Sequence, residues 1–172
     1  MFKINISDLK EVEIAFENKD YEAALEKIGE IETRVGVIGP HLLWIRGVCL
    51  DMLGDHIAAL KCIRSGLAMD GTYYNLGASW DVVLSNVRSQ LASIENDNVD
   101  ISFFKEVHDY IIEVGAMTSG LQYALLRNYL IRNAFDEFDP MLRNGLERNP
   151  NSPELLELQQ LRTPSLKLAQ MS

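Results

Sequence analysis

Apolar residues recur every three or four positions along most of this chain, and short polar or glycine-containing breaks interrupt them. The first such run contains Ile6, Leu9, Val12 and Phe16. This spacing places apolar side chains on one face of an α-helix. No Asn-Gly or Asp-Gly turn lies between alternating apolar runs, so β-hairpins are not indicated. The chain is therefore expected to be all-α.

The breaks divide the helical runs into pairs with short connections. They lie at residues 18–20, 35–40, 54–55, 70–71 and 149–154. Two of them contain helix-start signals, because proline is favoured in the first turn of a helix and serine is a good cap. Pro40 opens one helix, and Ser152 with Pro153 opens another. Short connections between helices predict αα-hairpins.

The segment 40–73 carries the most regular pattern. It places a large residue before a small one in its first helix, Leu43 before Gly47, and the turn is Gly54-Asp55. The second helix contains Ala59, Ile63 and Gly66. This pattern resembles the tetratricopeptide repeat, a helix–turn–helix unit of roughly 34 residues. Small residues at such positions let two helices approach closely where they cross.

Two further segments resemble weaker copies of this repeat. Residues 5–38 keep Ala24 in a small position, but Lys19 replaces the turn glycine and Val12 replaces the small residue of the first helix. Residues 119–152 keep Gly145, whereas Leu126, Asn133 and Phe138 depart from the pattern. A phenylalanine at a helix crossing is expected to force the helices apart.

The resemblance implies a single domain, residues 1–172, stacked as a short right-handed superhelix of tetratricopeptide type. Residues 74–118 are expected to form a degenerate repeat with two longer helices, about 79–95 and 101–114. A capping helix is expected over residues 153–163, with fraying after Pro164. A generic helical bundle is the alternative fold.

Composition and charge narrow the function classes. The net charge is −9, and the acidic excess lies in residues 1–39 and 79–118. An acidic surface repels phosphates, so nucleic acid is not expected as a partner. No apolar run reaches the roughly 20 residues of a membrane span, and the N-terminus has no signal-peptide pattern. The chain is therefore expected to be cytoplasmic, with Cys49 and Cys62 as free thiols.

The sequence gives little indication of catalysis or metal binding. Residues 96, 98, 100 and 102 alternate as in an EF-hand, but Ile101 and Val107 stand where glycine and glutamate are required. The three histidines, His41, His56 and His108, fall on different helices without nearby ligands. We therefore expect no metal, no cofactor and no enzymatic activity.

The resemblance also implies a binding groove, because the first helices of such repeats line a concave face. The residues at these positions that we expect to contact a partner are Phe16, His41, Trp44, Val48, Asp51, Tyr123, Arg127 and Leu130. Aromatic residues and arginine are enriched at interface cores. The alternative for Phe16, Trp44 and Tyr123 is that they are core residues.

Three function hypotheses follow. The first is an adaptor or scaffold that binds a peptide or helix of a partner protein in the groove. The second is a chaperone that holds an apolar client for secretion, which small acidic proteins with three such repeats resemble. The third is an enzyme or its regulatory domain, which requires a deep polar pocket with converging titratable groups. A homo-oligomer is compatible with each of them.

Overall fold

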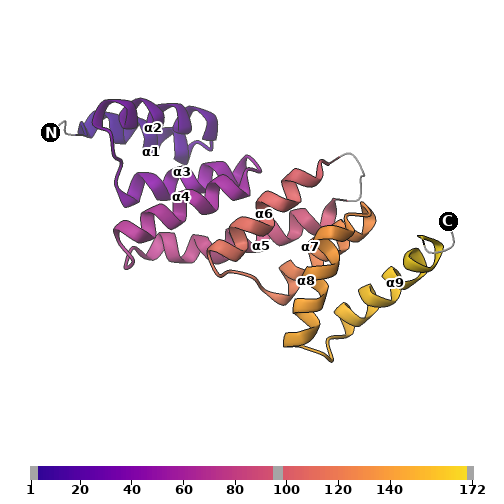
Figure 1. Cartoon of the computed structure of the whole chain (residues 1–172). Coiled ribbons are helices and arrows are strands. Elements are labelled where there is room, and N and C mark those ends of the chain that lie inside the picture. The colour runs from indigo at the N-terminus through magenta and orange to yellow at the C-terminus, as the bar shows by residue number, and fades with distance from the viewer. Residues whose placement is uncertain (1–3, 95–98, 170–172) are drawn as a thin grey trace. The chain divides into compact units, whose positions relative to one another are not determined.

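A computed structural model describes residues 4–94 and 99–169, and these residues form helices without any strand. Figure 1 shows the helices in chain order. They are α1 (Ile6–Glu17), α2 (Tyr21–Val35), α3 (Pro40–Met52), α4 (His56–Met69), α5 (Tyr74–Ser93), α6 (Ile101–Glu113), α7 (Ser119–Ile131), α8 (Phe135–Arg148) and α9 (Pro153–Ala169). The all-α expectation is confirmed for the described part of the chain.

The same turn closes three of the helix pairs, α1–α2, α3–α4 and α7–α8. Each turn has one residue with a positive φ, which is 61° at Lys19, 88° at Gly54 and 54° at Asn133. The amide of the next residue donates to a carbonyl five positions back, as in Asp20 N to Ala15 O at 2.9 Å. This pattern is the Schellman motif, which satisfies the free carbonyls at a helix end.

The pair α3–α4 and the pair α7–α8 repeat one another in length and in packing. Their helices have 13 and 14 residues in both cases. Gly66 and Gly145 hold equivalent positions in the second helices. A Cβ at Gly66 would lie 2.6 Å from Leu76 Cδ1, and a Cβ at Gly145 would lie 2.9 Å from Leu155 Cδ1. Both glycines therefore allow close approach of the helix that follows.

The two pairs differ at their helix crossings. In α3–α4 the crossing is formed by Gly47 and the fully buried Ala59, and a Cβ at Gly47 would lie 2.9 Å from Ile63 Cγ1. In α7–α8 the equivalent residues are Leu126 and Phe138, both fully buried. The larger side chains fill the crossing, so α7 and α8 pack less closely than α3 and α4. The expectation that Phe138 separates its helices is confirmed.

Several expected boundaries were wrong. Helix α5 begins at Tyr74 rather than near residue 79, immediately after a turn in which Asp70 accepts a hydrogen bond from the amide of Thr72 at 2.9 Å. Helix α9 runs to Ala169 and does not end near residue 163. Pro164 removes one backbone donor, and the helix continues beyond it. Pro40 and Pro153 do open helices, as expected.

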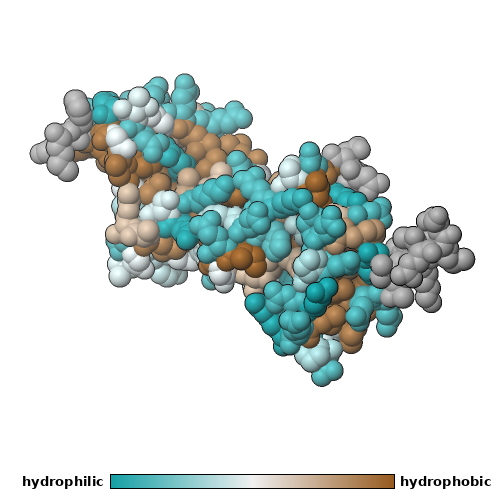
Figure 2. Space-filling model, in the orientation of Figure 1, coloured by the Kyte–Doolittle hydropathy of each residue, from teal (hydrophilic) through white to brown (hydrophobic). Residues whose placement is uncertain are grey.

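The chain divides into two compact units, Met1–Val87 and Arg88–Ser172. The N-terminal unit contains a core that includes Val12, Ile28, Leu42 and Cys49. Figure 2 shows hydrophobic side chains gathered over α1 to α3 of this unit. This division does not test the expected single domain over residues 1–172, which stays a prediction.

Candidate functional site

Aromatic side chains from α1, α2, α3 and the connection before α5 form a cluster on one side of the N-terminal unit. The rings of Phe16 and Trp44 lie 5.5 Å apart at 70°, and those of His41 and Trp44 lie 5.8 Å apart. Tyr21 contacts Phe16, and Tyr73 contacts His41. Edge-to-face contacts of this kind stabilise aromatic pairs beyond simple burial. We call Phe16, Tyr21, His41, Trp44 and Tyr73 the aromatic cluster.

Within the aromatic cluster, His41 of α3 contacts both Glu13 of α1 and Tyr73, the residue before α5. Its Nδ1 lies 2.8 Å from the hydroxyl of Tyr73, and its Nε2 lies 3.3 Å from Oε1 of Glu13. A carboxylate only accepts hydrogen bonds. A neutral His41 therefore carries its proton on Nε2 and donates to Glu13, while the Tyr73 hydroxyl donates to Nδ1.

Helix α5 contacts α3 at two places on the side of α3 that carries Trp44. The indole Nε1 of Trp44 donates to Oγ of Ser79 at 3.2 Å, and Nδ2 of Asn86 donates to Oδ2 of Asp51 at 2.8 Å. Val82 lies between these two contacts on the same face of α5, and it is 57% exposed. The first helices of successive pairs, α1, α3 and α5, thus contribute to one surface.

Asp51 stabilises this surface from within. Its Oδ1 lies 2.6 Å from Nδ1 of His56 at the start of α4, and its Oδ2 accepts from Asn86 of α5. Only 9% of its side chain is exposed. Both carboxylate oxygens are therefore engaged within the chain, and Asp51 ties three helices together.

Five of the predicted partner-binding residues fall in the N-terminal unit. Phe16, His41 and Trp44 lie together in the aromatic cluster, half-buried, and Trp44 packs against the edge of the hydrophobic core. Val48 is half-buried one turn after Trp44. The structure thus brings these side chains to one side of the unit, and their contact with a partner stays a prediction.

The other three predicted residues fall on α7 in the C-terminal unit. Arg127 is exposed, and its Nη1 donates to the carbonyl of Ala92 at 3.4 Å. Leu130 is half-buried. Tyr123 lines a pocket that the sequence did not predict. A role for any of the three in partner binding also stays a prediction.

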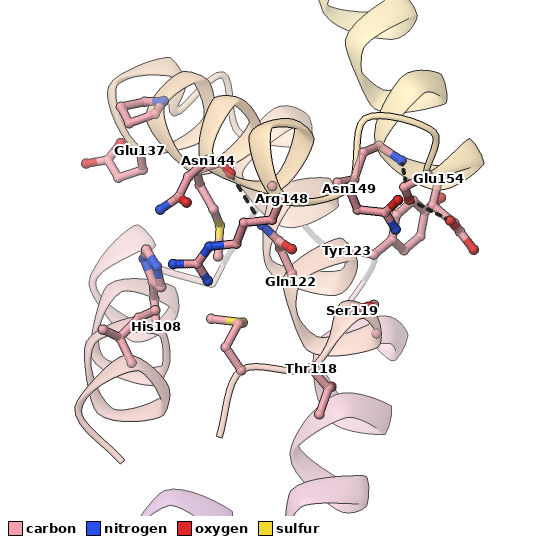
Figure 3. Close-up of a pocket in the computed structure, with 18 of the residues that line it drawn as sticks. His108, Thr118, Ser119, Gln122, Tyr123, Glu137, Asn144, Arg148, Asn149 and Glu154 are labelled. Atoms are coloured by element: carbon pink, nitrogen blue, oxygen red, sulfur yellow. Dashed lines mark hydrogen bonds between the residues drawn. The ribbon is translucent and has the colours of Figure 1, made fainter. Parts of the chain in front are cut away.

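This pocket lies within the C-terminal unit and has a volume of about 680 Å³. Helices α6, α7, α8 and α9 and the connections before α7 and α9 line it. Its polar side chains include His108, Gln122, Asn144 and Arg148, and Figure 3 shows Arg148 reaching toward His108 and Asn144. Its size lies within the range of small-molecule sites.

Two residues that line the pocket, Glu137 and His108, have shifted pKa values. Glu137 pairs with Lys105, and this hydrogen bond keeps the pKa of the carboxyl below its usual value. Burial lowers the pKa of His108, with Asp109 acting in the opposite direction. The imidazole of His108 is therefore neutral at pH 7, and its Nδ1 lies 3.4 Å from the Tyr129 hydroxyl.

The sequence features considered for metal binding and the two expected free thiols can be located in the structure. Residues 96 and 98 of the EF-hand-like pattern lie outside the described residues, and Asp100 instead caps α6 by accepting from the amide of Ser102. Among residues 4–94 and 99–169, no group of three histidine, cysteine or acidic side chains is arranged to hold a metal ion. Cys49 and Cys62 are free, and burial raises the pKa of the Cys49 thiol to about 11.

Sequence reasoning missed the contribution of α5 and the whole pocket. The contacts of Tyr73 with His41 and of Ser79 with Trp44 depend on how the start of α5 packs against α3, which the sequence pattern does not give. Part of the signal for the pocket was in the sequence, since Leu126 and Phe138 predicted a wider crossing of α7 and α8. Which polar side chains meet there depends on helix packing, which sequence spacing does not determine.

Comparisons with known proteins give no relative from which a role can be transferred. The chain matches no protein-family model, no curated protein and no solved structure. Within the described ranges, no helix combines the length and hydrophobicity that crossing a membrane requires.

Proposed function

We propose that this chain is a protein-binding module built from tetratricopeptide-like helix pairs. The surface formed by α1, α3 and α5 would bind a peptide or helix of a partner protein. The observation that carries the proposal is the aromatic cluster, in which Phe16, His41 and Trp44 pack together while remaining only partly buried. Large aromatic side chains near the surface are common centres of protein interfaces.

Neighbouring side chains add apolar area and negative charge to this surface. Val82 of α5 is 57% exposed, and Met52 near the end of α3 is 58% exposed. Glu13 and Glu17 of α1 are exposed next to the aromatic cluster. An apolar centre with an acidic edge favours a segment that is amphipathic and basic, as in helix-in-groove binding.

The test combines capture of the partner with one substitution. The tagged protein is used to isolate partners from its native cells, and the recovered protein is then titrated against wild type and Trp44→Ala. We expect Trp44→Ala to lower affinity by roughly 2 kcal/mol or more, as at an interface hot spot. Its cost in stability should remain below the roughly 3–5 kcal/mol of a core tryptophan.

Trp80→Ala is the matched control, because Trp80 is a half-buried tryptophan of the same unit outside the aromatic cluster. It should leave partner affinity close to that of wild type. If Trp44→Ala unfolds the protein without a separable loss of binding, Trp44 is a core residue and the proposed surface is wrong.

A further inference from the structure

We propose that the pocket of the C-terminal unit binds a small monocarboxylate with a flexible apolar chain. The site lies within residues 108–155 and is formed by α6, α7, α8 and the start of α9. It is distinct from the aromatic cluster of the N-terminal unit, so the two proposals can succeed or fail separately.

The pocket follows from the packing of the last helix pair. Leu126 and Phe138 fill the crossing of α7 and α8, where the equivalent residues of α3 and α4 are Gly47 and Ala59. Gln122 lies against α8, where a Cβ at Gly145 would lie 2.5 Å from its Nε2. There Nε2 of Gln122 donates to the carbonyl of Met141 at 3.3 Å. Gln122, Met141, Asn144 and Gly145 line the pocket together.

Arg148 supplies the charge that would recognise the carboxylate. It is the only arginine or lysine among the described residues that line the pocket. In Figure 3 its guanidinium points toward His108 and Asn144, whereas the carboxylates of Glu137 and Glu154 point away from it. The guanidinium can bind a carboxylate through two parallel hydrogen bonds, and the amide of Asn144 adds a further donor.

The acidic residues that line the pocket are Asp136, Glu137 and Glu154, and each is stabilised by a group other than Arg148. Glu137 pairs with Lys105, and an oxygen of Glu154 accepts from Oγ of Ser152 at 2.8 Å. Asp136 lies in the first turn of α8, where a negative charge is favourable. Arg148 is thus left for a ligand. The surrounding acidic charge favours a ligand with a single negative charge over a phosphate.

The rest of the lining suits an apolar chain. Ile112, Met117, Met141 and Leu155 border the pocket. Methionine side chains are flexible and adapt to irregular apolar ligands. The lining residues of α8 extend from Asp136 to Arg148, a length of about 18 Å at the rise of an α-helix. An elongated chain fits such a site better than a compact ring.

Decanoate is the probe, titrated into the full chain by calorimetry below its micelle concentration. We expect saturable binding at one site, weakened about tenfold or more by Arg148→Gln. Arg143→Gln is the matched control, because Arg143 is also an exposed arginine of α8 but does not line this pocket. Decanol provides the same chain without the charge and should bind more weakly than decanoate.

Three results would overturn the proposal. The first is the absence of saturable decanoate binding to the folded wild type. The second is equal affinity of Arg148→Gln and Arg143→Gln, which would show that Arg148 does not recognise the carboxylate. The third is inorganic phosphate or decanol binding as tightly as decanoate, because either would remove the chemical selectivity. Unfolding curves of both variants ensure that only folded proteins are compared.

Discussion

At the residue scale, equivalent turns of two helix pairs place different residue types at the position with a positive φ. Lys19 and Gly54 both have positive φ, at 61° and 88°, in turns with the same hydrogen bonds. Left-handed backbone costs a residue with a Cβ roughly 1–2 kcal/mol, whereas glycine adopts it freely. The N-terminal turn therefore stores strain that the second turn avoids.

Substitutions at these two positions should therefore have opposite effects on the free energy of unfolding. Lys19→Gly should raise the free energy of unfolding by about 0.5–1 kcal/mol, because relief of the strain exceeds the added freedom of the unfolded chain. Gly54→Ala should lower it by about 1 kcal/mol, since an alanine there would meet no neighbour within 4 Å and only the backbone would be strained. Urea midpoints measure both effects, and a change of the same sign in both variants would contradict the strain argument.

His108 predicts a pH dependence of stability. Its folded pKa is lowered below the ordinary value of 6.5, mainly by burial. As pH falls through 6.5, the unfolded chain takes up a proton at this position before the folded protein does. The contribution of a neutral His108 is thus complete above pH 6.5 and is lost as pH falls toward its lowered pKa.

The measurement compares urea unfolding at pH 7.5 and about pH 5.5 for wild type and His108→Gln. The variant should lose less stability over this interval, because its side chain does not titrate. His41→Gln serves as the control for a general effect of removing a histidine. Equal losses in wild type and His108→Gln would show that burial of His108 does not link proton binding to folding.

At the element scale, the crossing of α3 and α4 depends on two small residues. Ala59 is fully buried, and its carbonyl oxygen would lie 3.4 Å from a Cβ at Gly47. Ala59→Leu should overpack this crossing and lower the free energy of unfolding by roughly 1–3 kcal/mol. Ala68→Leu, an exposed position on the same helix, should have little effect. Equal urea midpoints for the two variants would show that the crossing tolerates a large side chain.

The elements also show how far the sequence determined the structure. Small residues at Gly47, Ala59 and Gly66 predicted the helix crossing correctly, because close approach leaves a direct mark on residue type. Phe138 correctly predicted a wider crossing in the last pair. The start of α5, at Tyr74, was predicted too late in the sequence. The contacts of Ser79 and Asn86 with α3 were missed for another reason, because they depend on how α5 packs against α3. The orientation of Arg148 in the pocket arises from the packing of four helices, which sequence spacing cannot provide.

At the scale of the whole molecule, charge is distributed unevenly. The net charge of −9 comes mainly from residues 1–39 and 79–118. Glu13 and Glu17 place part of this charge next to the aromatic cluster. A field of this kind accelerates the encounter with a basic partner at low ionic strength, and salt screens it. The overall charge therefore bears on how fast the proposed partner binds, more than on how tightly.

This argument leads to a prediction about association rates. If the acidic edge steers a basic partner, the association rate of wild type should fall markedly between low and physiological salt, where the screening length is about 8 Å. Glu13→Gln with Glu17→Gln should reduce the rate at low salt and flatten its salt dependence, with little change in dissociation.

The control, Glu26→Gln with Glu30→Gln on α2, removes the same charge away from the aromatic cluster. Stopped-flow mixing with the captured partner measures these rates. An association rate that does not depend on salt would contradict electrostatic steering. Equal effects of the two double variants would show that net charge, rather than the surface of α1, α3 and α5, causes the steering.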